Sequence, residues 1–133
     1  MNNKLFFSSE LQTGRTPNDL YIMLDKEFNF DFDPCPTDPK FDGLQLRKWG
    51  KSTYVNPPYN QQKAWVERAL FHHWDERGTI IVMLLPALTD TKLFHDVILP
   101  LAKEIRFIKG RLRFEQYNNS APFPSMIVIF KND

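Results

Sequence analysis

Thr53-Tyr54-Val55-Asn56-Pro57-Pro58-Tyr59 is the stretch of sequence that decides the fold. Residues 52–55 are rich in β-branched and aromatic side chains, as strands are. The two prolines then fix two φ angles and remove two N–H donors, so the strand has to end at Asn56. Residues 61–74 follow with apolar side chains at helical spacing. The stretch therefore predicts a strand, a rigid corner and a helix.

The segment after this helix predicts a second, more deeply buried strand. Residues 79–85 form a continuous apolar run rich in β-branched side chains, bounded by Gly78 and Pro86. Such a run suits a strand that helices cover on both faces, as in a parallel sheet. Residues 89–102 then predict another helix.

The C-terminal part predicts two strands without a helix between them. They cover residues 104–114 and 126–131, and the loop 115–125 joins them. Because a parallel pair needs a crossover connection, these two strands are expected to pair antiparallel.

The N-terminal part predicts a loose start, a helix and a short strand. Residues 1–15 show no period, and Thr16-Pro17 then marks a helix start, with threonine as the cap and proline at the first helical position. The helix is expected over residues 17–28. The alternation of Phe30-Asp31-Phe32-Asp33 predicts a short strand, which the prolines at 34, 36 and 39 end.

This order of elements predicts an α/β fold, because strands alternate with helices. We expect a mostly parallel sheet with an antiparallel C-terminal strand and helices on both faces. Residues 16–133 are expected to form a single domain, preceded by a flexible arm over residues 1–15. In such sheets ligands bind at the carboxyl ends of the strands. The loops 33–36 and 56–59 both follow predicted strands, which makes them candidates for a site.

Size and composition limit the class of protein. The chain has 133 residues, of which 42% are hydrophobic and 25% charged, as in an ordinary soluble domain. Cys35 is the one cysteine, so no intramolecular disulfide is possible and a reducing cytoplasm is the expected setting. The longest apolar run, 80–88, is about half the length of a membrane span, so we expect no membrane association.

Charge and histidine placement say less about partners. The net charge of +1 neither demands nor excludes nucleic acid, since clustering on one face decides such binding. A local basic run near the C-terminus is best explained as a solvated strand face; it consists of Arg106, Lys109, Arg111 and Arg113. His72 and His73 have no cysteine or acidic partner at ligand spacing, so no metal is expected.

The proline corner presents hydrogen-bond acceptors and an aromatic ring. The side-chain oxygen of Asn56 and the carbonyl of Pro57 are positioned to accept from an amine, and the ring of Tyr59 follows at once. A proline turn between a strand and a helix is the plain structural alternative. The position of the motif after a predicted strand favours a functional site.

The order of motifs along nearly the whole chain resembles the phage-type DNA N6-adenine methyltransferase family. The motifs that carry the resemblance are Thr16-Pro17, Asp33-Pro34-Cys35, Asp42-Gly43-Leu44 with Trp49, Asn56 to Tyr59, Leu85-Pro86-Ala87, Gly110-Arg111-Leu112 with Phe114, and Pro122 to Ser125. The resemblance implies a compact Rossmann-like methyltransferase fold. It also implies an adenine-specific DNA methyltransferase that uses S-adenosyl-L-methionine as its cofactor.

For the proline corner, the resemblance implies catalysis on a base that has left the duplex. Asn56, Pro57, Pro58 and Tyr59 would be the catalytic residues. Acceptors on the amine of adenine would make its lone pair available and stabilise the positive charge that develops on nitrogen. Tyr59 would stack on the flipped base.

For the cofactor, the resemblance implies a site around the loop after the first strand. Asp33 would accept from the methionine ammonium in a charge-assisted bond; the structural alternative is a strand-end cap. Structural alternatives also exist for Thr16, as a plain helix cap, and for Asp42, as a turn residue. The full set of expected cofactor residues is Thr16, Pro17, Asp33, Pro34, Cys35, Phe41, Asp42 and Asn56.

For DNA, the resemblance implies contacts near the last two strands. Phe123 would sandwich the flipped base together with Tyr59, or else fill the core. Arg111 would contact a phosphate, or else pair with an acidic neighbour. A homodimer would supply recognition surface that so short a chain lacks, and the location would be the host cytoplasm if a phage encodes the protein.

Two other functions remain open at the level of sequence. One is methylation of another planar amine, such as an RNA base or a protein glutamine. The other is a non-catalytic subunit that binds the cofactor or DNA. The chain also departs from many methyltransferases, because the loop 33–38 contains no glycine to let the backbone approach the cofactor.

Overall fold

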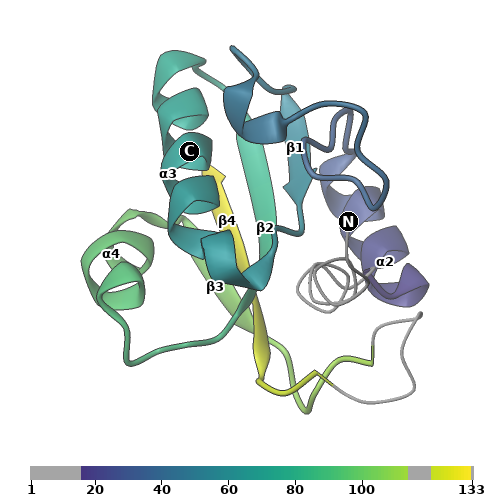
Figure 1. Ribbon diagram of the computed structural model, residues 1–133, viewed down its shortest axis with the longest axis vertical. Coiled ribbons are helices and arrows are strands. Elements are labelled where there is room, and N and C mark those ends of the chain that lie inside the picture. Colours follow the sequence, from purple (N-terminus) through teal and green to yellow (C-terminus); the bar gives the residue numbers. More distant parts are fainter. Residues whose placement is uncertain (1–15, 114–120, 133) are drawn as a thin grey trace, which may run out of the picture.

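A four-stranded sheet forms the centre of the molecule (Figure 1). The computed structural model describes residues 16–113 and 121–132; the expected arm 1–15 and most of the loop 115–125 lie outside these ranges. The strands are β1 (Ser52–Val55), β2 (Ile80–Pro86), β3 (Glu104–Phe107) and β4 (Ser125–Lys131), and they lie side by side in the order β1-β2-β4-β3.

The strand pairing is mixed. β1 pairs in parallel with β2, whereas β4 pairs antiparallel with both β2 and β3. The α/β class and the antiparallel C-terminal strand are therefore confirmed. The expectation of a mostly parallel sheet is not, because only one of these three described pairs is parallel. The Rossmann-like character stays a prediction.

Helices cover both faces of the sheet. In Figure 1, α2 (Asn18–Phe28) lies to the right of the strands, and α3 (Gln62–Asp75) and α4 (Leu99–Leu101) lie to the left. The side chains of β2 alternate between the two layers, as the pleat of a strand requires. One layer contains Ile81, Met83 and Leu85 with the buried side chains of α3. The other contains Val82 and Leu84 with Leu24 and Phe28 of α2.

The predicted helix over 89–102 is shorter and wider than expected. It consists of a π-helical stretch, η3 (Leu93–Ile98), followed by the short α4. The N–H of Leu99 donates to the carbonyl of Phe94, five residues earlier. Pro100 follows and has no N–H to continue an α-helical ladder, which accounts for the wider turn at this point.

The predicted strand over residues 30–33 is wrong as an extended element. Only Phe32 forms a parallel bridge, opposite Thr53 of β1. The N–H of Asp31 donates to the carbonyl of Ser52 at 2.8 Å, and the N–H of Tyr54 donates to the carbonyl of Phe32 at 3.0 Å. Pro34 has no N–H to extend the ladder, so pairing stops after one residue.

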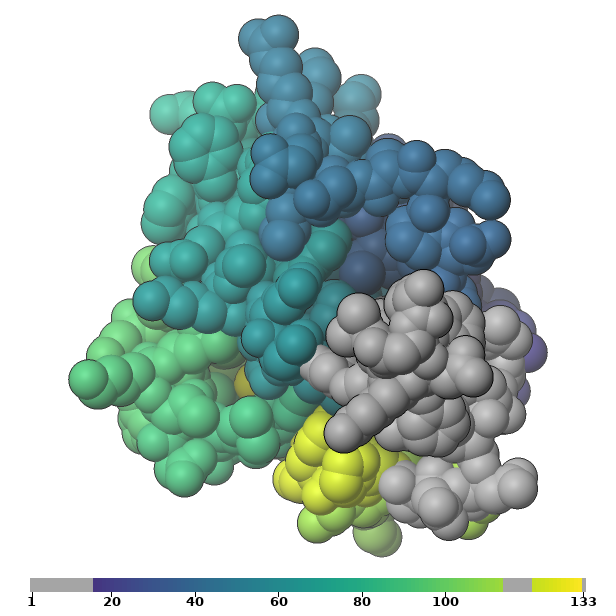
Figure 2. Space-filling view, viewed as in Figure 1, coloured from purple at the N-terminus to yellow at the C-terminus, as the bar shows by residue number. Residues whose placement is uncertain are grey.

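The segment between this bridge and β1 folds tightly against α3. It contains the 3₁₀ turn η1 (Gly43–Gln45), and a Cβ at Gly43 would lie 2.0 Å from the carbonyl oxygen of Pro34 and 2.9 Å from the ring of Trp65. Glycine is therefore required here by close approach rather than by φ. In the space-filling view this segment (blue) fills the upper right of the visible face (Figure 2).

Buried His72 of α3 anchors the end of the same segment. Its Nδ1 accepts from the N–H of Trp49 at 3.1 Å, which leaves Nε2 to donate to the carbonyl of Gly50 at 2.9 Å. Both ring nitrogens are therefore occupied by backbone groups of the turn that leads into β1.

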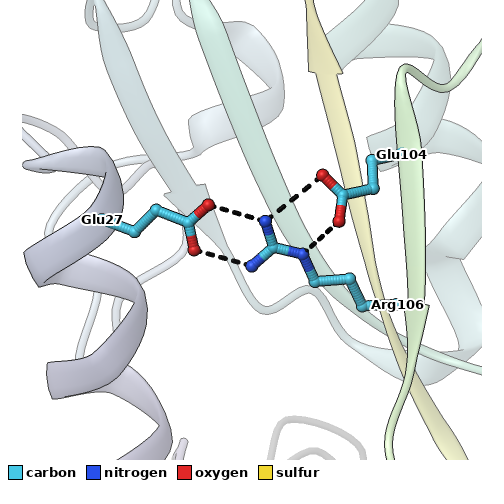
Figure 3. A network of polar contacts seen from close by, with 3 residues as sticks. All are labelled: Glu27, Glu104 and Arg106. Carbon is cyan, nitrogen blue, oxygen red and sulfur yellow. Dashed lines mark hydrogen bonds and ion pairs between the residues drawn. The ribbon is translucent and has the colours of Figure 1, made fainter.

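An ion-pair network joins α2 to β3 on the opposite face (Figure 3). Arg106 of β3 donates to both carboxylate oxygens of Glu27 on α2, at 2.7 and 2.6 Å, and to Glu104 two residues away on its own strand. Its guanidinium also lies 5.5 Å from the ring centroid of Phe28. These contacts lower the pKa of Glu27 and of Glu104 and raise that of Arg106. The network holds the C-terminal half of α2 against the sheet edge.

Candidate functional site

Strand register brings the predicted site segments to one edge of the sheet. Asn56 leaves the carboxyl end of β1, and the bridge of Phe32 to Thr53 sends the loop 33–36 out at the same edge. Because Ser125 of antiparallel β4 is paired with Pro86 at the end of β2, the residues just before β4 emerge there too. The segments 108–111 and 121–124 lie next to each other at this edge. The N–H of Ile108 donates to the carbonyl of Ser125 at 3.0 Å, just after the second segment.

Asn56 is held by a side chain from the start of α2. It is only 6% exposed, and its Nδ2 donates to Thr16 Oγ1 at 3.2 Å. Thr16 Oγ1 in turn lies 2.7 Å from the hydroxyl of Tyr54. The alternative that Thr16 is a plain helix cap is wrong: Pro17 occupies the cap position, and no side-chain hydrogen bond caps α2. Thr16 instead links two residues of β1 and its corner.

The rest of the corner turns directly into α3. Pro57 is buried and Pro58 is half-buried. The carbonyl of Pro58 accepts from the N–H of Gln61 at 3.1 Å, which closes the 3₁₀ turn η2 (Tyr59–Gln61). The rigid corner predicted from the sequence is therefore present, followed by one tight turn.

Tyr59 and Phe123 come together across the site. Their ring centroids are 4.6 Å apart and the ring planes meet at 87°, an edge-to-face contact. Both rings are half-buried and pack on the layer that contains α2. Phe123 thus contacts Tyr59 and fills part of the core, and its contact with a flipped base stays a prediction.

Asp33 is a largely buried carboxyl group. Its Oδ1 accepts from the N–H of Cys35 at 2.8 Å, and burial raises its pKa to about 6 despite that bond. Burial raises the pKa of Tyr21 and of Tyr54, and the charge of Asp33 raises both somewhat further. Burial and the same charge raise the pKa of Cys35 to about 12, so this thiol stays protonated and is a poor nucleophile.

Asp42 and Phe41 lie at the start of the 3₁₀ turn η1. Asp42 Oδ1 accepts from the N–H of Leu44 at 3.0 Å, so the carboxylate serves as the turn residue that the sequence left as an alternative. Phe41 is 40% exposed and stacks on Phe32 with 6.2 Å between ring centroids. Their contact with a cofactor stays a prediction.

The basic run near β3 is divided between two roles. Arg106 is committed to the ion pairs with Glu27 and Glu104. Arg111 is exposed, follows a turn in which Gly110 has a φ of 73°, and donates to the carbonyl of Ala121 at 3.4 Å. Arg111 therefore lies close to the segment that carries Phe123, whereas Arg106 stabilises the fold.

The sequence profile of the family described as DNA N-6-adenine-methyltransferase (Dam) matches residues 8–132. The chain belongs to this family. The match confirms the family-level resemblance inferred from the order of motifs, and it makes DNA adenine methylation the activity at the level of the family. No curated protein matches the chain.

Tyr54 is the site residue of this Dam-family chain that sequence reasoning missed. Its side chain is only 2% exposed, and it looked like one more apolar residue of a strand. The signal was its spacing: Tyr54 lies on β1 two residues before Asn56, and side chains two apart along an extended backbone point the same way.

Neither a metal site nor a membrane span was found in the ranges that the structure describes. Within residues 16–113 and 121–132, no three side chains of histidine, cysteine, aspartate or glutamate gather as metal ligands would. None of the helices in these ranges has the length and apolar character needed to cross a bilayer.

Proposed function

We propose that this Dam-family protein transfers a methyl group from S-adenosyl-L-methionine to the N6 amine of a flipped-out adenine in DNA. The observation that carries the proposal is the hydrogen bond from Asn56 to Thr16. It connects the corner that would hold the base with the start of the helix that would bind the cofactor. Asp33 lies at the same edge of the sheet.

The residues present fit the proposed cofactor. Asp33 is a largely buried acceptor; burial raises its pKa to about 6, and positive charge and further donors would favour its ionised form. An ammonium group would supply both. Thr16 and Pro17 stand at the positive N-terminus of α2, where a carboxylate is favoured. When bound, S-adenosylmethionine supplies a methyl group on a positively charged sulfur.

The corner would act on the adenine amine through fixed acceptors. The lone pair of this amine is delocalised into the ring, so the nitrogen is a poor nucleophile. Acceptance of its two N–H groups by Asn56 Oδ1 and by the carbonyl of Pro57 would favour a tetrahedral nitrogen. The same oxygens would stabilise the positive charge that develops there. Pro58 keeps the corner rigid because its φ is fixed.

The aromatic pair and Arg111 would bind the substrate. Tyr59 would stack on the extruded base, with Phe123 on its other side, because every base offers a π face. Arg111 would contact a phosphate beside the extruded nucleotide. Such a contact would add affinity without sequence information.

The decisive experiment is a transfer assay with cofactor labelled in its methyl group. Label recovered as N6-methyladenine from duplex DNA of mixed sequence supports the proposal. Label in RNA or in protein glutamine would favour the other planar amines. No label, with DNA still retarded on a gel, would favour a non-catalytic subunit.

Asn56→Ala tests the role of the corner itself. We expect it to abolish methylation and to weaken cofactor binding much less than Asp33→Asn does, because the variant removes the proposed acceptor and leaves Asp33 in place. Full activity of this variant would refute the assignment of Asn56.

A further inference from the structure

Three side chains form a continuous hydrogen-bonded chain at the carboxyl end of β1. The Tyr54 hydroxyl lies 2.7 Å from Thr16 Oγ1, and Asn56 Nδ2 donates to the same oxygen at 3.2 Å. A threonine hydroxyl has one donor and two acceptor sites, so it has the capacity for both bonds. Tyr54 on β1 packs in the layer that contains α2, and Asn56, just past the end of β1, reaches the same threonine.

We propose that Tyr54 is a positioning residue, which acts through Thr16 to hold the side-chain amide of Asn56 in its productive orientation. This inference rests on the proposed function, because it concerns the same adenine amine. An asparagine amide has a donor end and an acceptor end of nearly the same shape. Only the orientation that presents Oδ1 to the substrate accepts from an amine.

The bond to Thr16 uses the donor end of the Asn56 amide. Nδ2 points at Thr16 Oγ1, so Oδ1 points away from it. If Thr16 were not held, its side chain would be able to rotate about χ1 and this preference would weaken. The bond to the Tyr54 hydroxyl opposes that rotation, because it fixes Thr16 Oγ1 from a second direction.

Tyr54 is well suited to serve as the fixed end of this chain. Its ring is buried. Its ring centroid lies 5.2 Å from that of Tyr21, in an edge-to-face contact, and 5.2 Å from that of Phe30, in a tilted contact. Burial also raises the pKa of its hydroxyl, which therefore stays neutral. A phenylalanine would fill the same apolar space, so packing alone does not explain a hydroxyl at this depth.

The test compares Tyr54→Phe with Tyr21→Phe. Both substitutions remove one phenolic oxygen, and the two rings touch each other, but Tyr21 makes no hydrogen bond to Thr16 or Asn56 among the described contacts. We expect Tyr54→Phe to lower kcat about tenfold, the loss of one hydrogen bond, while KM for DNA and Kd for the cofactor change less than about twofold. We expect Tyr21→Phe to retain wild-type kcat.

Two variants of Thr16 test the link between Tyr54 and Asn56. Thr16→Val keeps the shape and removes the hydroxyl, and Thr16→Ser restores the hydroxyl. We expect serine to recover most of the kcat that valine loses. Adding Tyr54→Phe to Thr16→Val is expected to cause no further loss in kcat, because the chain is already broken.

The outcomes separate this inference from the proposed function. An inactive wild-type protein would overturn the proposed function and the inference with it. An active wild-type protein whose kcat is unchanged in Tyr54→Phe would overturn the inference alone. The same holds if Tyr21→Phe loses as much kcat as Tyr54→Phe, or if the double variant loses the product of the two single effects.

Discussion

Tyr59 and Phe123 meet edge to face, with 4.6 Å between their ring centroids. A base stacked between two parallel rings would need roughly 7 Å, twice the contact distance of about 3.5 Å between carbon atoms. The two rings therefore have to part before they hold a base. Their own contact is worth about 0.5–1.5 kcal/mol, and stacking on a base returns about 1–3 kcal/mol.

Removing one of these rings tests the sandwich. Phe123→Ala is expected to lower kcat/KM for methylation of duplex DNA by roughly 5- to 100-fold, the equivalent of one lost stacking contact. Steady-state rates at several DNA concentrations measure this effect. The matched control is Phe107→Ala on β3, whose ring is 61% exposed and outside the site, and which is expected to keep normal kinetics. Equal losses in both variants would contradict the sandwich.

Asp33 predicts how cofactor binding depends on pH. Its pKa of about 6 means that the carboxyl group is protonated in more acidic solution and then accepts poorly from an ammonium. Cofactor affinity, measured by calorimetry, is expected to fall as pH decreases from 7 to 5, by up to about tenfold per unit below the pKa. Asp33→Asn is expected to bind weakly at every pH in this range.

The same substitution is expected to stabilise the fold without cofactor. Burial raises the pKa of Asp33 from 3.8 to about 6 in the folded state. The protonated carboxyl group therefore adds to the stability of the fold in full below pH 3.8, and this stability is lost as pH rises through 6. At pH 7.5, Asp33→Asn is expected to raise the free energy of unfolding by about 1–2 kcal/mol, allowing for residual solvent. Asp38→Asn is the control, since that carboxylate is 89% exposed. A less stable Asp33→Asn protein would argue against this account.

Arg111 predicts a change in the salt dependence of DNA binding. If it contacts one phosphate, Arg111→Ala is expected to reduce the slope of log K against log salt by about 0.9. Fluorescence anisotropy with duplexes of different sequence measures the slope, and the loss of affinity is expected to be uniform among them. Lys51→Ala is the matched control, because this exposed lysine precedes β1 at the opposite edge of the sheet. An unchanged slope in Arg111→Ala would rule out the phosphate contact.

The network around Arg106 predicts a loss of stability that depends on pH. Arg106→Met is expected to lower the free energy of unfolding by about 1 kcal/mol at pH 7, the upper range for exposed ion pairs. Hydrogen bonds from Arg106 lower the pKa of Glu27 and of Glu104 below the ordinary value of 4.5. The stability that these ion pairs add is therefore present above pH 4.5 and is lost as pH falls through the lowered pKa values. Denaturant unfolding at pH 7 and pH 3 should show the difference between variant and wild type shrinking at the lower pH. The control is Lys40→Met, whose 84% exposed ammonium lies 3.6 Å from Asp38.

Local pattern predicted most elements of the fold, because each depends on nearby residues. The helix over 17–28 and the strand over 52–55 are confirmed almost to the residue. The position of β4 between β2 and β3 was not predictable in the same way, since order in a sheet depends on contacts distant in sequence. The strand over 30–33 failed for a related reason: its alternation was correct, but Pro34 left only Phe32 with a partner.

For the candidate site, the sequence predicted which residues to consider but few of their contacts. The motif order located Asn56 and Tyr59, and strand register then explains why their segments meet at one edge. Thr16 was predicted as a helix cap because local rules favour that role, but its hydroxyl bonds residues 38 and 40 positions away. Only the tertiary fold brings such groups together. The loop 33–38 contains no glycine of its own. Gly43, in the turn that follows, instead allows the backbone to approach Pro34 closely.

The central place of β4 has a consequence for synthesis on the ribosome. β3 is translated before β4, and in the described sheet its only partner is β4. β4 must therefore leave the exit tunnel before β3 and the far side of β2 acquire their backbone partners. Until then these edges are exposed to other nascent chains, and pairing with β4 removes edges that would otherwise favour aggregation.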